Sequence, residues 1–369
     1  MERGAGWQMA EEQGIEAAVQ GSRKRHGGSR RPTIREVSQL AGVSRMTVSR
    51  VLSVPELVLP ATRERVRQAI VDLGYVPDKA AGGLSSRRTG FIALILPTLT
   101  NANFAAVAHG LTEVLREADY HLLIAYTEYD MAEEERQLRN LLARRPEAIV
   151  LTGAVHRRNA SRLLIAADIP VIEIADVPQQ PIDHAIGFSN YQVGRTAARY
   201  LMGRGFKRIG AVAASNVGDV VDHRGEERMR GFEDELAFAG IATDLVLRHG
   251  VAPVSFSHGT AALGELLRRA SDVEAVFAVS DLSAVGVIME CQRRGMTVPG
   301  DISVMGFGDF EIGREFNPAL TTIHVDFTAL GGRAGRMIME VLDAEEREPS
   351  RVIDVGLELL ERASVADRR

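Results

Sequence analysis

The residues with the clearest capacity for chemistry lie at positions 33–52, in the stretch TIREVSQLAGVSRMTVSRVL. Its apolar side chains recur where two short helices would pack on each other, and Gly42 stands where the turn between them needs a positive φ. The second helix would expose a run of polar and long side chains, namely Ser44, Arg45, Met46, Thr47, Ser49 and Arg50. Arginine can donate two hydrogen bonds to guanine, methionine can pack on a thymine methyl group, and hydroxyls suit phosphate oxygens. The pattern predicts a helix-turn-helix whose second helix enters the major groove of DNA.

Three short helices are predicted around this stretch. Thr33 and Glu36 have the spacing of a capping box, so the first helix begins there and continues to Ala41. Ser44 caps the second helix, and residues 61–73 form the third, which a glycine ends. The alternative interpretation is a helical hairpin that has a polar surface and no role in DNA binding.

The charge distribution agrees with a unit that binds a polyanion. The chain of 369 residues has a net charge of -5, yet residues 21–90 carry 14 Lys and Arg against 5 Asp and Glu. A basic block on an acidic body is typical of a nucleic-acid-binding unit, although a solvated basic surface would give the same charges. The single cysteine, Cys291, excludes an intramolecular disulfide framework and a multi-cysteine metal site. With no secretory signal and no apolar run of membrane length in view, we expect a cytoplasmic protein without membrane contact.

From residue 91 onward the sequence alternates between apolar runs and amphipathic stretches of helix length. The apolar runs predict strands at 91–96, 121–125, 148–151, 170–174, 208–213, 275–279 and 302–307. The stretches between them predict helices such as those at 131–144, 191–203, 224–239 and 281–294. This alternation predicts parallel sheets covered by helices on both faces, and about 280 residues suit two doubly wound lobes. The expected fold class is therefore α/β, with an all-α head in front of a two-lobed core.

The head resembles the DNA-binding domain of the lactose-repressor (LacI/GalR) family of bacterial transcription regulators. The likeness rests on GVSRMTVSRVL (42–52), TRERVRQAIVDLGYVP (62–77) and the leucine that ends AAGGL. It continues in the body through ADIPVIEI (167–174), GRTAARYLMGRGFKRIG (194–210), DISVMGFGD (301–309) and PALTTIHVDF (318–327). The resemblance implies a homodimer that binds operator double-stranded DNA and a small-molecule effector, with no metal or cofactor. It also implies that the core has the two-lobed fold of periplasmic binding proteins.

The expected domain organisation has four parts. Residues 1–31 lack periodic apolar positions and are expected to form a disordered tail, with Met9 as an alternative start of the protein. Residues 32–77 would form the DNA-binding domain, 78–89 the hinge segment and 90–369 the ligand-binding and dimerisation core.

The resemblance implies DNA contacts beyond the second helix. These would come from Thr33, Tyr75, Ala81 and Leu84, and Leu84 would act as a wedge that kinks the central base step. The sequence departs from the family pattern at positions 82 and 83, which are both glycine. Because each glycine weakens a helix by ~1 kcal/mol, the hinge helix should depend more strongly on DNA and on dimerisation.

The body resembles in particular the gluconate-operon repressors of this family, through LPTLTNANFAAVAHGL (96–111), AIGFSNYQVGR (185–195) and GFGDFEIG (306–313). We therefore expect a sugar acid such as gluconate as the effector, and a neutral sugar or a sugar phosphate is the alternative. The expected effector site consists of Asn101, Phe104, Glu173, Asp176, Arg228, Asp281 and Asp309. Arg228 would bind a carboxylate through its planar guanidinium, and Phe104 would cover the carbon chain.

Several of these residues have a structural alternative. Phe104 could be a core side chain, Arg228 could pair with Glu235, and Asp281 could simply cap a helix. Sugar-binding members of the family often carry an acidic or amide residue where this chain has Gly308, followed here by Asp309. One carboxylate fewer in the cleft would favour an anionic ligand.

Two other classes of function compete with a DNA-binding regulator. An enzyme would be indicated by a nucleophile elbow, a P-loop or an HExxH motif, and the sequence contains none of these. A secreted solute-binding protein would carry a signal peptide and no helix-turn-helix. The chain has no heptad pattern after its last predicted strand, which favours a dimer over a tetramer.

Overall fold

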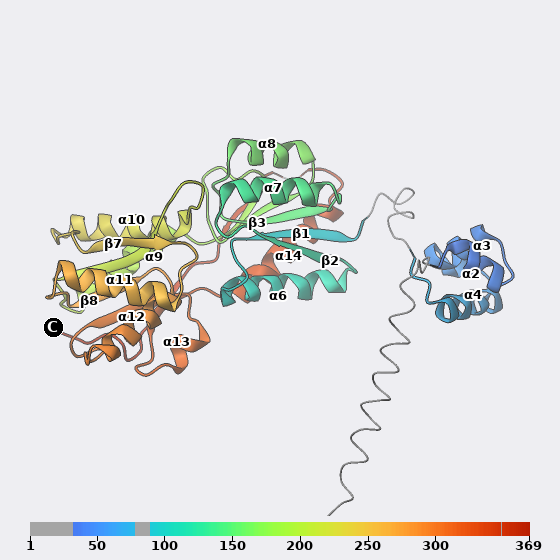
Figure 1. Ribbon diagram of the computed structural model, residues 1–369. Coiled ribbons are helices and arrows are strands. Elements are labelled where there is room, and N and C mark those ends of the chain that lie inside the picture. Colours follow the sequence, from blue (N-terminus) through green and yellow to red (C-terminus); the bar gives the residue numbers. More distant parts are fainter. Residues whose placement is uncertain (1–31, 78–88, 348) are drawn as a thin grey trace, which may run out of the picture. The chain divides into compact units, whose positions relative to one another are not determined.

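The computed structural model of the protein describes residues 32–77, 89–347 and 349–369 (Figure 1). The chain divides into two compact units, Met1–Arg87 and Arg88–Arg369. The expected tail, and all of the expected hinge segment except Thr89, lie outside the described residues. None of the helices in these ranges is both long and apolar enough to cross a membrane.

The first unit is a three-helix body built around one apolar core. Its helices are α2 (Ile34–Leu40), α3 (Arg45–Ser53) and α4 (Pro60–Leu73), and a short 3-10 helix at Pro55–Leu57 separates the last two. The core consists of small apolar side chains at helical spacing: Val37, Ala41, Val48, Val51, Val66 and Ala69. The three helices confirm the sequence-based prediction to within about two residues at each end.

Local sequence signals set the ends of these helices. The hydroxyl of Thr33 accepts a hydrogen bond from the backbone N–H of Glu36, whose carboxylate accepts one from the backbone N–H of Thr33 at 2.7 Å. α4 begins without a side-chain cap, but Pro60 has no N–H that would need a partner at the first helical position. Gly74 ends α4 with a φ of 59°, a conformation that favours glycine.

The second unit contains two lobes, each a six-stranded sheet with helices on both faces (Figure 1). The first lobe has the strand order β11-β5-β4-β3-β1-β2, and all its strands are parallel. These strands are β1 (Phe91–Leu96), β2 (His121–Tyr126), β3 (Ala148–Thr152), β4 (Val171–Ile174), β5 (His184–Gly187) and β11 (Val352–Asp354). One face is covered by α6 (Ala102–Glu117) and α14 (Phe327–Asp343), and the other by α7 (Met131–Leu142) and α8 (Arg158–Ala167).

The second lobe repeats this architecture with the strand order β12-β10-β9-β8-β6-β7. Its strands are β6 (Ile209–Ser215), β7 (Val246–Val251), β8 (Ala275–Ala278), β9 (Ser303–Phe307), β10 (Thr321–His324) and β12 (Glu358–Leu360). Only β12 is antiparallel, against β10. The helices are α9 (Asn190–Gly203), α10 (His223–Phe238), α11 (Phe256–Arg269), α12 (Asp281–Arg293) and the short α13 (Glu311–Glu315).

The chain passes between the lobes three times, after β5, after β10 and after β11. Three phenylalanines pack together beside the first two crossings. The ring of Phe188 lies 5.6 Å from that of Phe307 and 5.8 Å from that of Phe327. These aromatic contacts belong to an apolar core that extends through both lobes.

The predicted two-lobed α/β fold is confirmed, and seven of the strands coincide with the predicted apolar runs. The strands that the sequence did not predict are β5, β7, β10, β11 and β12. Four of these have three or four residues, and β7 contains the polar pair Arg248 and His249. Such segments carry too little apolar periodicity to be recognised alone.

Paired helices approach each other closely at glycines. Between α9 and α10, a Cβ on Gly194 would lie 1.8 Å from the carbonyl oxygen of Arg228, and one on Gly231 would lie 2.0 Å from that of Tyr191. The equivalent pairs are Gly110 and Gly331 between α6 and α14, and Gly259 and Gly286 between α11 and α12. At these positions glycine is required because the two backbones touch.

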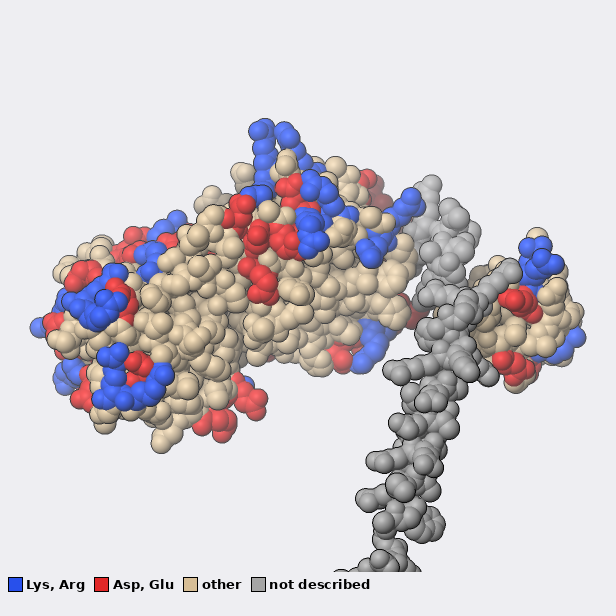
Figure 2. Space-filling view, viewed as in Figure 1, with Lys and Arg blue, Asp and Glu red and all other residues tan. Residues whose placement is uncertain are grey.

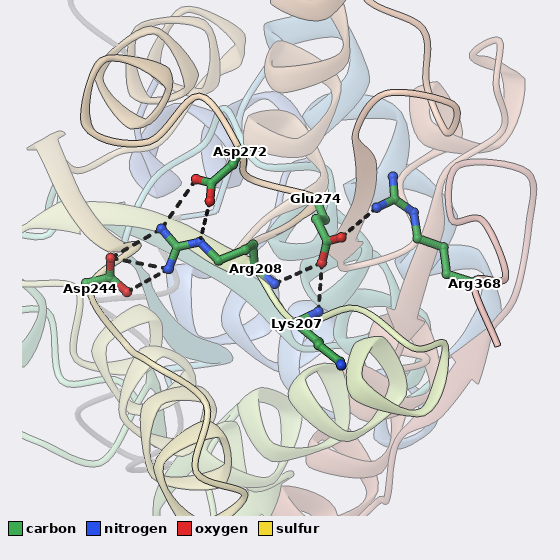
Figure 3. A network of polar contacts seen from close by, with 6 residues as sticks. All are labelled: Lys207, Arg208, Asp244, Asp272, Glu274 and Arg368. Atoms are coloured by element: carbon green, nitrogen blue, oxygen red, sulfur yellow. Dashed lines mark hydrogen bonds and ion pairs between the residues drawn. The ribbon is translucent and has the colours of Figure 1, made fainter.

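A network of charged residues fixes the edge of the second lobe where β6 and β8 begin (Figure 3). Oε2 of Glu274 accepts hydrogen bonds from the backbone N–H groups of Lys207 and Arg208, at 2.8 and 2.9 Å. Its Oε1 accepts one from the guanidinium of Arg368 at 2.7 Å, which joins the C-terminal segment to the sheet. Burial raises the pKa of Glu274, but these donors outweigh it and leave the pKa below its usual range. Arg208 also pairs with Asp244 and Asp272.

We expect Gly231→Ala to lower the free energy of unfolding by about 1–3 kcal/mol, because the new methyl group meets backbone that cannot move aside. The matched control is Gly203→Ala at the end of α9, where a Cβ would meet nothing within 4 Å. In that control the free energy of unfolding should rise by roughly 0.5–1 kcal/mol, because alanine has a higher helix propensity than glycine. Urea unfolding followed by circular dichroism measures the free energy of unfolding of both variants. Equal effects of the two substitutions would contradict the close approach of α9 and α10 at Gly231.

We expect Glu274→Ala to destabilise the second unit by about 1–2 kcal/mol at neutral pH, because hydrogen bonds to a charged acceptor are lost. The folded pKa is lowered, so the stabilisation is present above the unfolded pKa and disappears as the pH falls through the folded pKa. The difference between variant and wild type should therefore shrink below about pH 4. Denaturation at a series of pH values tests this, and a constant difference down to pH 3 would refute it.

Candidate functional site

The exposed side of α3 carries the side chains that the sequence assigned to base reading. Arg45, Ser49 and Arg50 are exposed, and Met46 has 66% of its surface accessible. Exposed apolar side chains also occur elsewhere on this unit, as at Leu57 and Leu59, so the exposure of Met46 leaves it available for a contact but does not by itself mark an interface. Figure 2 shows basic side chains projecting from the visible face of this unit.

Ser44 and Thr47 also form the N-terminal cap of α3. The hydroxyl of Ser44 accepts a hydrogen bond from the backbone N–H of Thr47 at 3.1 Å and lies 2.9 Å from the hydroxyl of Thr47. The cap therefore orients both hydroxyls at the N-terminus of α3, where the unpaired N–H groups and the helix dipole favour a phosphate.

The other residues assigned to DNA contact lie in different places. The hydroxyl of Thr33 donates to the carboxylate of Glu36 at 2.8 Å, so it serves the capping box. Tyr75 is half-buried and packs against the core of the head. Ala81 and Leu84 lie outside the described residues.

The structure adds one basic residue that the sequence did not single out. A shallow groove beside α3 is lined by Thr47 and Arg50 on one side and by Thr62 and Arg65 of α4 on the other. Two guanidinium groups and two hydroxyls in one groove suit phosphate oxygens. The helical pattern of α4 identified its buried face, but not which of its arginines would lie beside α3.

In the second unit, a cleft lies between the lobes, and the space in it that no atom fills is about 490 Å³ when open solvent is included. Its aromatic lining comes from Phe104, Tyr129, Phe188, Phe307, Phe310 and Phe327. Its polar lining comes from Asn101, Asn103, Asp222, Arg224, Arg228 and Ser280. Apolar walls with a few convergent polar groups are the usual composition of a small-molecule site.

Arg228 is the central polar group of this cleft. It projects from α10 and is 8% exposed, and its Nη1 donates to the Oδ1 of Asn190 at 2.9 Å. Its guanidinium lies over the ring of Phe307, 4.4 Å from the ring centre, and its Nε has no hydrogen-bond partner among the described residues. Burial lowers the pKa of Arg228 to about 10. The expected alternative partner, Glu235, is instead held by Arg195 and Arg199.

A second compartment adjoins the first, and Tyr129 and Arg224 line both. The space in it that no atom fills is about 430 Å³ when open solvent is included. Asp176 and Glu134 contribute carboxylates to it. Burial raises the pKa of Asp176. Arg224 donates to the carbonyl oxygen of Thr152 at 3.1 Å, so it reaches from the second lobe into the first.

The two lobes are also joined by backbone contacts around the cleft. The side-chain amide of Asn103, in α6, donates to the carbonyl oxygen of Gly308 at 3.1 Å. On the other side, the backbone N–H of Val221 donates to the carbonyl oxygen of Tyr129 at 3.0 Å. The backbone N–H of Met131 donates to the backbone carbonyl oxygen of Asp219, also at 3.0 Å. A cleft closed by such contacts holds its lining in a fixed arrangement.

The structure brings four of the seven residues expected at the effector site to the cleft. Asn101, Phe104 and Arg228 line the first compartment, and Asp176 lines the second. Phe104 is also part of the apolar core, so its two interpretations are compatible. The side-chain oxygen of Asn101 accepts from the backbone N–H of Asn103 at the start of α6, which leaves its amide group for a ligand.

The other three expected residues lie outside the cleft, and their carboxylates are engaged within the lobes. Glu173 accepts from the backbone N–H of Ile182 at 2.9 Å and lies 3.3 Å from His156. Asp309 pairs with Arg362 and His324. An effector role therefore does not fit Glu173 or Asp309.

Asp281 is fully buried and likewise does not reach the cleft. Its carboxylate accepts from the backbone N–H of Phe310 at 2.8 Å and from the hydroxyl of Thr322 at 2.7 Å. Burial raises its pKa to about 7. The cap of α12 is Ser280, so Asp281 is neither an effector contact nor the expected helix cap.

Sequence reasoning missed five polar residues that shape the cleft: Asn103, Tyr129, Asn190, Asp222 and Arg224. Asp222 caps α10 by accepting a hydrogen bond from the backbone N–H of Gly225. An aspartate directly before a helix is a common N-cap, so the sequence could have predicted this role. The position of Tyr129 had no such signal, because it depends on a loop with positive φ values that no sequence pattern specifies.

The cleft can bind a polar organic anion. It offers two guanidinium groups, side-chain amides and aromatic faces, which suit a carboxylate, hydroxyls and a carbon chain. Within the three described ranges, no group of three His, Cys, Asp or Glu side chains gathers as metal ligands would.

Comparison with known proteins assigns both units. Residues 33–78 match the model of bacterial regulatory proteins of the lacI family, and residues 198–365 match the periplasmic binding protein-like domain. The HTH-type transcriptional regulator GntR of Pseudomonas aeruginosa is 33% identical over 334 residues, which cover 90% of this chain and 96% of that protein.

Solved structures agree with this assignment. A LacI-family transcriptional regulator from Silicibacter pomeroyi superposes with a TM-score of 0.84 at 31% identity, over 91% of this chain and 99% of the other. A complex of the transcriptional regulator CelR with cellobiose gives a TM-score of 0.64 at 31% identity, over 90% of this chain and 100% of the other. The chain therefore belongs to the LacI family of bacterial regulatory proteins and is a DNA-binding transcriptional regulator.

Proposed function

We propose that this protein is a repressor that binds a pseudo-palindromic operator as a homodimer and changes its DNA affinity when a sugar acid occupies the cleft. Each subunit would place α3 in the major groove of one half-site. The effector would be an aldonate, with D-gluconate or a close relative as the first candidate.

The observation that carries the effector proposal is the state of Arg228. Its guanidinium is buried at the cleft, and no Asp or Glu of the described residues forms an ion pair with it. A buried charge without a direct counter-ion is costly, and a ligand carboxylate would supply the missing partner through paired hydrogen bonds. Phe104 and Phe307 would cover the apolar side of the carbon chain.

The resemblance to gluconate-type regulators supports the same ligand class. Part of this resemblance lies in a segment that lines the cleft, because residues 96–111 include Asn101, Asn103 and Phe104. Sequence likeness in the lining carries more information about the ligand than likeness in the buried core.

A neutral sugar is the second candidate, and a specific feature favours it. Asp222 and Asp176 act on Arg228 at longer range and raise its pKa, so the cleft already contains compensating negative charge. The solved relative CelR binds the neutral disaccharide cellobiose. Carboxylates close to the ligand are good acceptors for sugar hydroxyl groups.

We expect Arg45→Ala to weaken binding to a duplex selected by the wild-type protein by about 1–3 kcal/mol and to relax the preference at one base position. Fluorescence anisotropy with single-base variants of that duplex measures this. The charge-matched control is Arg67→Ala, which removes an exposed arginine from α4. An equal loss on every sequence would identify Arg45 as a phosphate contact instead.

We expect Arg228→Ala to weaken D-gluconate binding by about 2 kcal/mol or more, because it removes the carboxylate partner. Isothermal titration calorimetry measures this, with Arg230→Ala as the control on the same helix, where the side chain is exposed and pairs with Glu227. Unchanged affinity in Arg228→Ala would remove this residue from the site. If the wild-type protein binds cellobiose and shows no binding of gluconate at millimolar concentration, the neutral sugar is favoured as the effector.

A further inference from the structure

The chain enters the core of the second unit at a point held by one glutamate. Oε1 of Glu147 accepts hydrogen bonds from the backbone N–H groups of Thr89 and Gly90, both at 2.7 Å. Its Oε2 accepts one from the hydroxyl of Tyr120 at 2.9 Å. The hydroxyl of Thr89 also donates to the carbonyl oxygen of Arg145 at 2.9 Å. Thr89 and Gly90 directly precede β1, so these contacts set where the first strand begins.

The second lobe contains the same arrangement at the equivalent place. Glu274 directly precedes β8, as Glu147 directly precedes β3, and it accepts from the two backbone N–H groups that precede β6. Both glutamates therefore tie the start of the central strand to its neighbour in the sheet. The shared contact is a feature of the lobe architecture, and it accounts for stability in both lobes.

The two positions differ in what the clamped chain is connected to. In the second lobe, the residues before Lys207 belong to a turn that follows α9 within the same lobe. In the first lobe, the residues before Thr89 lead along the chain to the DNA-binding unit. Among the described residues, Thr89 and Gly90 are thus the first of the core after the DNA-binding unit, and Glu147 holds them.

We propose that Glu147 is a positioning residue for DNA binding, because it fixes the point at which the chain from the DNA-binding unit joins the first lobe. A movement of the first lobe is then transmitted to the connecting chain at a defined position. Without the clamp, Thr89 and Gly90 gain backbone freedom that operator binding must remove again. Gly90 is held at a φ of 72°, and glycine loses more backbone freedom on ordering than any other residue.

This inference rests on the proposed operator binding, and the test uses the full-length protein with a duplex selected by the wild type from a randomised pool. We expect Glu147→Ala to weaken binding to that duplex about 10-fold, because two additional residues must be ordered. Glu147→Gln should bind nearly as well as the wild type, since the amide oxygen can accept the same two N–H groups. D-gluconate binding should stay within about twofold in every variant, because Glu147 does not line the cleft.

The matched control is Glu274→Ala, which removes the same clamp from the lobe that is not connected to the DNA-binding unit. It should lower thermal stability to a similar degree as Glu147→Ala but leave duplex affinity within about twofold of the wild type. If Glu147→Ala does not fold, Tyr120→Phe removes the hydroxyl that donates to Oε2 and should weaken duplex binding about threefold.

Two results would overturn the inference while leaving operator binding intact: a folded Glu147→Ala with wild-type duplex affinity, or an equal loss in Glu274→Ala. A wild type that selects no duplex at all would overturn the proposed function together with this inference.

Discussion

The core of this protein depends on a chain of hydrogen bonds that holds a buried guanidinium between two lobes. Arg228 donates to Asn190, and the amide group of Asn190 donates to the carbonyl oxygen of Ala175 in the other lobe at 3.0 Å. Burying a charge is costly, and this chain satisfies one donor of the guanidinium, while its Nε has no hydrogen-bond partner among the described residues. Through Asn190 the same chain links α10 to the first lobe. The crossing of α9 and α10 at Gly194 and Gly231 is what brings the two helices close enough to form it.

The two lobes are stabilised by the same kinds of contact. They differ in their connections, because the chain from the DNA-binding unit enters the first lobe. Each has a six-stranded sheet, at least one pair of helices that touch at glycines, and a glutamate that clamps the start of its central strand. Glu147 and Glu274 occupy equivalent positions, but only the first lobe receives the chain from the DNA-binding unit. In our proposal, a contact that stabilises the sheet therefore also fixes the chain that leads to the DNA-binding unit.

The sequence predicted what local periodicity determines and failed where long-range geometry decides. The head and the long helices were predicted because capping residues and apolar spacing are visible in one stretch of chain. Arg228 was expected at the cleft from the resemblance to the family, and it lines the cleft. Asp281 was assigned to the cleft because it follows a strand, but its carboxylate turns to the backbone N–H of Phe310 instead. The direction of a side chain after a strand depends on loops distant in sequence, as the position of Tyr129 beside Val221 shows.

Gly308 connects lobe closure to the chemistry of the cleft. Its φ of 122° is strained for any other residue, and a Cβ there would lie 2.8 Å from the side-chain nitrogen of Asn103 and 2.7 Å from the ring of Phe310. An acidic side chain at this position would break the hydrogen bond that joins α6 to the second lobe. The backbone conformation of Gly308 and its close neighbours therefore disfavour a carboxylate side chain at this position. In a cleft lined by two arginines, an anionic ligand then meets no carboxylate from this position, which agrees with the proposed preference for a sugar acid.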